Sequence, residues 1–289
     1  MITEEFFTLA DGGKIPKLGF GTWMIPDGKA EEAVKCAINA GYRHIDTAQA
    51  YKNEAGVGAG VRNCGVKREE LFVTTKVAAE NKSYESAAES IDESLKKSGL
   101  DYFDLIIIHS PQPWAEFRGT KRYFEENKAV WRALEDAKAA GKVRHIGVSN
   151  FLKDDLENIL SDCREKPQVN QILIHIGNTP EELISFCKEN GILPEAYSPI
   201  AHGEALKSGL ISSLAEKYGV SAAQLCIRYC LDLGAVTLPK ASTEEHIRQN
   251  ANVDFAISAE DLTKLKNIES LKDYGEFSHF PVFSKKEQL

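Results

Sequence analysis

The sequence lacks several features that mark specialised classes of protein. It has six cysteines but no CxxC pair, and no apolar run reaches the roughly 18 residues that a membrane span needs. The first ten residues contain no basic segment followed by an apolar one, so we expect no secretory signal. Free thiols are therefore expected, with Cys226 and Cys230 packed in the core of an apolar helix rather than bound to a metal.

Basic residues are outnumbered by acidic ones. The 35 Lys and Arg against 43 Asp and Glu give a formal net charge of -8, which argues against partners such as nucleic acid or an anionic membrane. A content of 43% hydrophobic and 27% charged residues excludes a disordered or fibrous chain. The length suits one large domain, so we expect residues 1–289 to form a single cytoplasmic unit and a monomer.

Short apolar runs alternate along the chain with stretches of 3.6-residue periodicity. The runs are typical of strands buried on both faces, and the periodic stretches indicate helices between them. The predicted strands are residues 18–21, 43–46, 71–76, 103–109, 143–148, 169–173, 193–197 and 235–238. The predicted helices are residues 29–40, 54–63, 84–98, 125–140, 153–161, 180–190, 209–218, 222–233, 244–251 and 259–268. This order predicts an α/β fold, a (β/α)8 TIM barrel with additional helices outside it, and an open doubly wound sheet is the alternative.

Two glycine-containing segments have separate interpretations. Residues 5–9 and 14–16 flank Asp11-Gly12-Gly13 and predict an N-terminal β-hairpin that plugs the bottom of the barrel. Residues 56–60 resemble a dinucleotide-binding glycine motif, but the sixth position is Val61 and no buried strand directly precedes the segment. We therefore expect these glycines to serve helix packing.

Polar side chains follow the predicted strands at the end where barrel enzymes carry their active sites. Asp46, Lys76 and His109 end the second, third and fourth strands, and Tyr51 comes soon after the second. A tyrosine hydroxyl has a reference pKa of ~10, and a neighbouring ammonium lowers it. Asp46 would hold Lys76 charged, and His109 would hydrogen-bond a substrate oxygen. Such a group suits carbonyl reduction, with the hydride supplied by a cofactor.

Seven segments resemble the aldo-keto reductase family across almost the whole chain. They are residues 19–23 (GFGTW), 41–48 (GYRHIDTA), 67–72 (KREELF), 147–151 (GVSNF), 169–171 (VNQ), 195–199 (EAYSP) and 238–240 (LPK). They occur in the family's order and at its spacing. The layout is most similar to short-loop bacterial and yeast-like members that reduce aldehydes, ketones and sugar derivatives.

The resemblance implies a catalytic tetrad of Asp46, Tyr51, Lys76 and His109, with Tyr51 as the general acid. The implied cofactor is NADPH, with NADH as the alternative because His246 stands where an arginine that contacts the 2′-phosphate is common. The implied cofactor contacts are Gly21, Thr22, Trp23, Asp46, Ser149, Asn150, Gln171, Tyr197, Ser198, Ile200, Lys240, Ser242, Thr243, His246, Gln249 and Asn250. Among these, Ser149, Asn150 and Gln171 would hold the nicotinamide carboxamide, and Tyr197 would stack on the ring.

The substrate side departs from the family pattern. The implied substrate contacts are Trp23, Tyr51, His109, Ser110 and Trp114, and no metal is implied. Ser110 replaces a tryptophan common in the family, which opens one wall of the pocket. The basic and aromatic residues 116–123 are expected in a loop near the pocket mouth. Residues 275–289, with Phe277, Phe280 and Phe283, resemble the family's tail that closes over the pocket; a terminus packed elsewhere is the alternative.

Other functions stay open on the residues alone. The expected partner is a small-molecule carbonyl compound that the protein reduces to an alcohol. One alternative is a nicotinamide-binding regulatory or redox-sensor module with little turnover. The other is a barrel lyase that uses Lys76 as a Schiff-base nucleophile.

Overall fold

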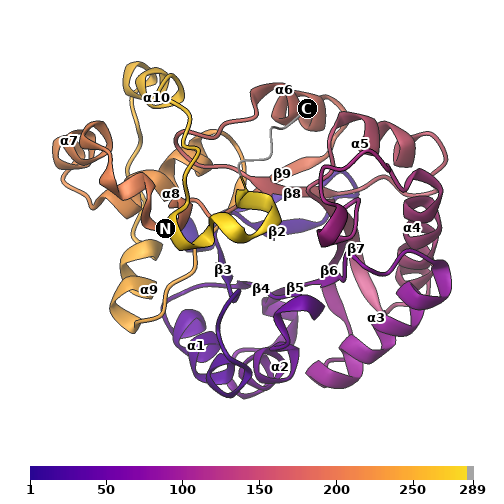
Figure 1. Cartoon of the computed structure of the whole chain (residues 1–289). Helices are drawn as coiled ribbons and strands as arrows, with labels where there is room; N and C mark the ends of the chain where they lie inside the picture. The colour runs from indigo at the N-terminus through magenta and orange to yellow at the C-terminus, as the bar shows by residue number, and fades with distance from the viewer. Residues whose placement is uncertain (285–289) are drawn as a thin grey trace.

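The computed structural model of the protein describes residues 1–284. Eight parallel strands pair in sequence order from β3 to β10. They are β3 (Gly19–Gly21), β4 (His44–Asp46), β5 (Phe72–Val77), β6 (Phe103–Ile108), β7 (Val143–Ser149), β8 (Val169–Leu173), β9 (Leu193–Tyr197) and β10 (Val236–Leu238). Thr237 N donates to Lys17 O at 2.9 Å, and Gly21 N donates to Pro239 O at 3.0 Å, so the last strand meets the first. The predicted barrel is confirmed (Figure 1).

Helices surround the strands, as Figure 1 shows. They are α1 (Asp27–Asn39), α2 (Glu54–Asn63), α3 (Tyr84–Ser98), α4 (Phe124–Ala139), α5 (Lys153–Leu160), α6 (Glu181–Glu189), α7 (Gly209–Tyr218), α8 (Ala222–Asp232), α9 (Glu244–Ala251) and α10 (Ala259–Lys266). Local chemistry sets their ends. In α3, for example, the Ser83 hydroxyl accepts from Ser86 N at 3.1 Å, and Gly99 ends the helix at φ 64°. The predicted bounds differ from these by two residues or fewer.

The predicted hairpin closes one end of the barrel. Its strands β1 (Phe6–Thr8) and β2 (Lys14–Pro16) are antiparallel. Leu9 and Ile15 from the hairpin are buried against a layer of inward-facing strand residues. That layer comprises Phe72, Leu105, Ile107, Val169, Val236 and Leu238. We refer to these eight side chains as the barrel floor.

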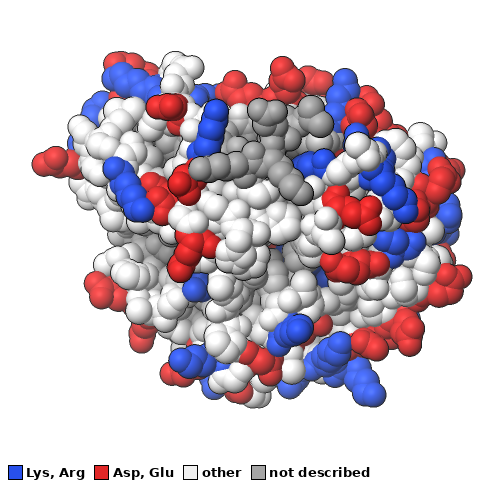
Figure 2. Space-filling view, in the orientation of Figure 1, with Lys and Arg blue, Asp and Glu red and all other residues white. Residues whose placement is uncertain are grey.

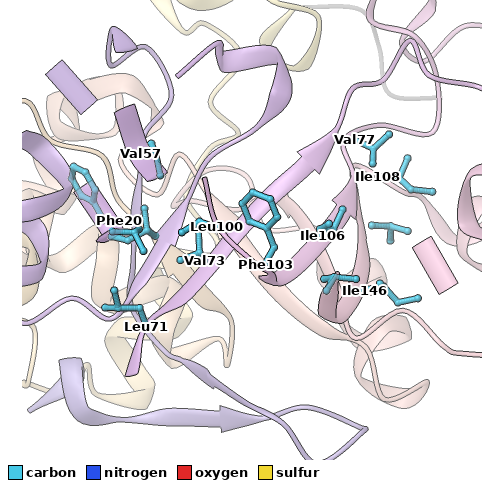
Figure 3. Packing of buried hydrophobic residues seen from close by; sticks show 14 of the residues in the cluster. Phe20, Val57, Leu71, Val73, Val77, Leu100, Phe103, Ile106, Ile108 and Ile146 are labelled. Carbon is cyan, nitrogen blue, oxygen red and sulfur yellow. The ribbon is translucent and has the colours of Figure 1, made fainter. Parts of the chain in front are cut away.

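The strands bury apolar residues on both faces. Val73, Ile106 and Ile108 pack outward in the main hydrophobic cluster, which also contains helical residues such as Val57 (Figure 3). Successive side chains along a strand point to opposite faces. Leu105 and Ile107 therefore face the barrel interior, and the same alternation brings His109 to the inner side just beyond the end of β6. This register places polar strand-end residues around a common opening.

The glycine segment and the apolar cysteines have the roles expected of them. An added Cβ at Gly56 or Gly58 of α2 would collide with backbone atoms of Asp27 or Ser98, so these glycines allow close helix packing. Cys226 and Cys230 are fully buried in α8. The packing role expected of each segment is confirmed.

The surface carries mixed charge on the face seen in Figure 2. Acidic and basic side chains are interspersed there, and neither sign forms a continuous patch. Within residues 1–284, no helix combines the length and apolar character required to cross a membrane.

Candidate active site

A buried ion pair lies where β4 and β5 end. Lys76 Nζ donates to Asp46 Oδ1 at 2.5 Å and to Thr47 O at 2.9 Å. Burial by itself lowers the pKa of Lys76, but the charge of Asp46 and the phenol of Tyr51 outweigh it, so the pKa is raised. Lys76 is therefore a fixed positive charge inside the barrel.

Tyr51 lies beside this charge. It ends the short 3-10 helix η2 (Gln49–Tyr51), and Lys76 Nζ is 4.8 Å from the centroid of its ring. The sequence predicts that Lys76 lowers the pKa of Tyr51. Lys76 has this effect, but burial raises the pKa of Tyr51 more strongly, so the net shift is upward. With its pKa raised, the Tyr51 hydroxyl keeps its proton at neutral pH.

His109 completes the predicted tetrad. Its ring centroid lies 5.6 Å from that of Tyr51 and 5.0 Å from that of Trp114, in edge-on contacts. Burial and the charge of Lys76 hold the pKa of His109 well below its ordinary value, so the imidazole is neutral. Its Nδ1 atom is buried and has no hydrogen-bond partner within residues 1–284. A neutral imidazole has one N–H to donate to an oxygen in the pocket.

Asn150 links the tetrad to the next strands. Asn150 Nδ2 donates to His109 O at 3.0 Å, and Tyr197 OH donates to Asn150 Oδ1 at 2.8 Å. The backbone of Asn150 is left-handed, with φ 61°, a conformation that asparagine tolerates better than most residues. Ser149 Oγ donates to Gln171 O at 2.8 Å. Asn150 Nδ2 also lies 3.1 Å from Ser149 Oγ, so hydrogen bonds link all four predicted carboxamide and ring contacts to the backbone of His109.

Gln171 joins two buried carboxylates, one of which the sequence analysis missed. Gln171 Nε2 donates to Asp46 Oδ2 at 2.9 Å and to Glu195 Oε2 at 2.8 Å. Both amide hydrogens are therefore used, and Gln171 Oε1 accepts no hydrogen bond within residues 1–284. Glu195 is 0% exposed, and burial together with the charge of Asp46 raises its pKa to about 8. Its position two residues before Tyr197, on the inward side of β9, was the signal that could have identified it.

Two further predicted contact residues, Thr22 and Ser110, form hydrogen bonds with backbone atoms. Thr22 Oγ1 donates to Asp46 O at 2.9 Å, directly after Gly21 at the end of β3. Ser110 is fully buried, and its Oγ accepts from Gln112 N at 3.3 Å. The Ser110 hydroxyl is thus engaged by its own loop.

The residues predicted for the adenosine end lie after β10 and on α9. Lys240 Nζ donates to Ser242 Oγ at 2.8 Å, and no carboxylate of residues 1–284 lies within 4.0 Å of it. Thr243 caps α9 by accepting from His246 N at 3.3 Å. The side chain of Gln249 donates to Glu245 at 3.1 Å on the exposed side of α9. Asn250 is buried. Lys240 is therefore the cation of this loop that is free to meet a phosphate.

An aromatic cluster covers the side of the opening near Trp23. The ring centroids of Trp23 and Phe280 are 5.0 Å apart, and those of Trp23 and His202 are 5.3 Å apart. Phe283 is 3% exposed and its ring centroid lies 6.5 Å from that of Tyr197. Figure 1 shows this C-terminal segment, in yellow, lying across the barrel. Residues 285–289 of the predicted tail lie outside the described residues.

The loop after β9 connects this cluster to Tyr197. Ser198 has φ 51° and its Oγ lies 3.3 Å from His202 Nε2. Ile200 packs against the hydrophobic cluster on this side of the barrel. His202, which the sequence analysis did not select, therefore contacts both a predicted cofactor residue and the C-terminal aromatics.

Comparison with known proteins identifies the family. Residues 17–270 match the aldo/keto reductase family. The chain belongs to that family. It is 44% identical over 264 residues to the glyoxal reductase of Bacillus subtilis, covering 91% of this chain and 92% of that relative. It is 36% identical over 302 residues to an aldehyde reductase of Saccharomyces cerevisiae, covering 95% and 96%.

A solved relative supports the same assignment. The crystal structure of a Bombyx mori aldo-keto reductase in complex with NADP matches with a TM-score of 0.83 and 32% identity, covering 96% of this chain and 98% of that one. The prediction of an NAD(P)H-dependent carbonyl oxidoreductase of the aldo-keto reductase family is thereby confirmed.

Glu195 should make the stability of this aldo-keto reductase depend on pH. Because its pKa is raised to about 8 when folded, the native state keeps a proton that the unfolded chain loses, and stability falls as pH rises toward 8. We expect the difference in free energy of unfolding between Glu195→Gln and the wild type to grow in favour of the variant by about 3 kcal/mol from pH 5.5 to pH 8.5. Urea unfolding at both pH values measures this. The exposed Glu93→Gln variant is the control, and an equal difference for both variants would contradict the prediction.

Proposed function

We propose that this chain reduces an aldehyde or ketone to the alcohol with NADPH, and that Tyr51 donates the proton. The observation that supports this most directly is the contact of a protonated Tyr51 with a charged, buried Lys76 beside a neutral His109. NADPH, when bound, supplies the hydride to the carbonyl carbon. Tyr51 gives its hydroxyl proton to the carbonyl oxygen, and the charge of Lys76 stabilises the phenolate that remains. His109 donates a hydrogen bond to the same oxygen.

The residues around the tetrad fit a nicotinamide cofactor. Gln171 Oε1 is left as a free acceptor because both amide hydrogens are already used, so it can accept from a carboxamide NH2. Ser149 and Asn150 lie next to it, and Tyr197 is held by Asn150 at one edge of the opening. We propose that these four residues hold and orient the nicotinamide ring.

Lys240 is proposed to favour NADPH over NADH. Among residues 1–284 its ammonium bonds a serine hydroxyl and pairs with no carboxylate, so it can meet a 2′-phosphate without breaking an ion pair with these residues. We expect Lys240→Met to weaken NADPH binding about tenfold, because a hydrogen bond to a charged group contributes roughly 1.5–3 kcal/mol and this site is partly exposed. NADH binding should change little.

Tryptophan fluorescence titrations with each cofactor measure both affinities. Arg248→Met is the matched control, since Arg248 is already paired with Glu244 at 2.7 Å. Equal losses for NADPH and NADH in the Lys240 variant would contradict a phosphate contact.

The first substrates to test are small aldehydes and dicarbonyl compounds. The glyoxal reductase and aldehyde reductase among its relatives support this choice. The purified protein should oxidise NADPH in the presence of glyoxal or an aromatic aldehyde, with the alcohol identified as product. Cofactor binding without turnover on any carbonyl would instead support a sensor. The Schiff-base alternative is not favoured, because Asp46 holds Lys76 charged and a charged amine is a poor nucleophile.

A further inference from the structure

Arg118 lies in the loop that follows β6, near the mouth of the barrel. Its guanidinium Nη1 donates to Asn150 O at 3.1 Å. The side chain of Asn150 bonds His109 O on one side and Tyr197 OH on the other. Asn150 therefore connects Arg118 to His109, which we propose contacts substrate, and to Tyr197, which we propose contacts the cofactor.

The loop holds Arg118 in a defined conformation. Its backbone is left-handed at φ 58°, which is uncommon for a residue with a Cβ. Gln112 fixes this turn: its Oε1 accepts from Arg118 N at 2.7 Å, and its Nε2 donates to Gly119 O at 2.9 Å and to Lys121 O at 2.6 Å. The guanidinium also lies 4.6 Å from the ring centroid of Phe117. The cation is thus positioned before any ligand arrives.

Arg118 has unused hydrogen-bonding capacity. An arginine has five N–H donors and its planar fork suits a carboxylate. Here one bond to Asn150 O is made, while the Nε atom is buried without a partner. A buried donor without a partner is costly.

No carboxylate of the described residues forms an ion pair with Arg118, although Asp155 is near enough to act on its charge. Within residues 1–284, no Asp or Glu oxygen lies within 4.0 Å of it. Its neighbour Arg122, by contrast, pairs with Asp155 at 2.9 Å and with Asp154 at 3.5 Å. The second oxygen of Asp155 is also taken, since Leu152 N donates to it at 3.0 Å. Burial lowers the pKa of Arg118, which an anionic ligand would offset.

We propose that Arg118 binds a carboxylate of the carbonyl substrate, so that this reductase prefers aldehydes and ketones that carry one. The inference rests on the proposed function, because it places the substrate's reacting carbonyl at Tyr51 and His109. The anion forms two hydrogen bonds with the guanidinium through its terminal nitrogens, because Nε is buried. The half-buried Trp114, whose ring centroid lies 5.0 Å from that of His109, belongs to the same loop, so the proposed carboxylate contact and the proposed carbonyl contact lie on one side of the barrel.

A matched pair of aldehydes tests the inference. 4-Carboxybenzaldehyde and its neutral amide, 4-carbamoylbenzaldehyde, differ in charge but hardly in size. We expect the wild type to have the higher kcat/KM for the carboxylate, and Arg118→Met to reduce the ratio of the two values about 10- to 100-fold, mainly through KM. Lys121→Met, which removes an exposed cation of the same loop, is the control and should keep the ratio.

Three further measurements separate the outcomes. An unchanged ratio in Arg118→Met would overturn the inference while leaving the proposed function intact. If Arg118→Met bound NADPH more weakly but kept the ratio of kcat/KM for the two aldehydes, Arg118 would contact a cofactor phosphate instead. That result would also overturn the inference. If the wild type reduced neither aldehyde, the proposed function would fail; benzoate binding, followed by tryptophan fluorescence near Trp114, would then decide the carboxylate site by itself. Arg118→Lys keeps the positive charge but loses the planar pair of donors. If Arg118→Met does not fold, this variant provides the test, and we expect its ratio of kcat/KM for the two aldehydes to be lower than that of the wild type.

Discussion

Replacing Tyr51 with Phe should lower kcat about 1,000-fold and leave the affinity for NADPH unchanged. The change removes only the hydroxyl that we propose as the proton donor, and general acid catalysis contributes typically 10²- to 10⁴-fold. The ring would keep its contacts with Lys76, 4.8 Å away, and His109, 5.6 Å away. Single-turnover reduction of an aldehyde by the preformed NADPH complex measures the chemical step directly.

Tyr42→Phe is the matched control for the loss of a phenol. Tyr42 is buried and its hydroxyl donates to Ile247 O at 3.3 Å, away from the tetrad. That variant should lose about 1 kcal/mol of stability and keep its turnover. Near-normal turnover in Tyr51→Phe would show that another group donates the proton, and His109 would be the next candidate.

Replacing Lys76 with Met should destabilise the fold by about 3–5 kcal/mol as well as abolish turnover. The substitution leaves the carboxylate of Asp46 buried without its partner, and an uncompensated buried charge has a cost of this size. Only the hydrogen bond from Gln171 would then remain on the side chain of Asp46. Urea unfolding followed by circular dichroism measures the loss.

The double variant Lys76→Met/Asp46→Asn separates the two effects. Removing both charges should restore much of the stability, because the neutral amide can still accept from Gln171. Turnover should stay lost, since no ammonium stabilises the phenolate of Tyr51. Stability losses that simply add would mean that the two side chains do not act as a pair.

The barrel and the tetrad could be predicted from the sequence because each rests on a regular pattern. Short apolar runs mark the strands, and the rule that barrel active sites lie at the strand ends then brings Asp46, Lys76 and His109 together. The net pKa shift of Tyr51 could not be predicted, because its sign depends on how completely the surrounding residues exclude water. Arg118 was selected only as part of a basic loop. The proposed role of Arg118 rests on its left-handed backbone and on its unpartnered Nε atom. Both depend on how that loop folds.

The buried position of Glu195 could have been predicted from the sequence, but its hydrogen bonds could not. The inward register of β9 was available from the alternation around Tyr197, so a carboxylate inside the barrel could have been noticed. Its hydrogen bond to Gln171, and through it the coupling to Asp46, required the relative heights of β8 and β9. Such cross-strand register is set by the packing of the whole barrel and is not visible in either segment alone.

The barrel floor has a consequence for the proposed role of Tyr51 as proton donor. Eight apolar side chains, including Leu9 and Ile15 of the hairpin, close the end of the barrel opposite the tetrad. In the proposed reaction, the route for a solvent proton to the Tyr51 phenolate is then the mouth, where the alcohol product and the oxidised cofactor would lie at the end of each cycle. Reprotonation is thus tied to product departure, and a solvent isotope effect on steady-state turnover would report on the opening of this one exit rather than on hydride transfer.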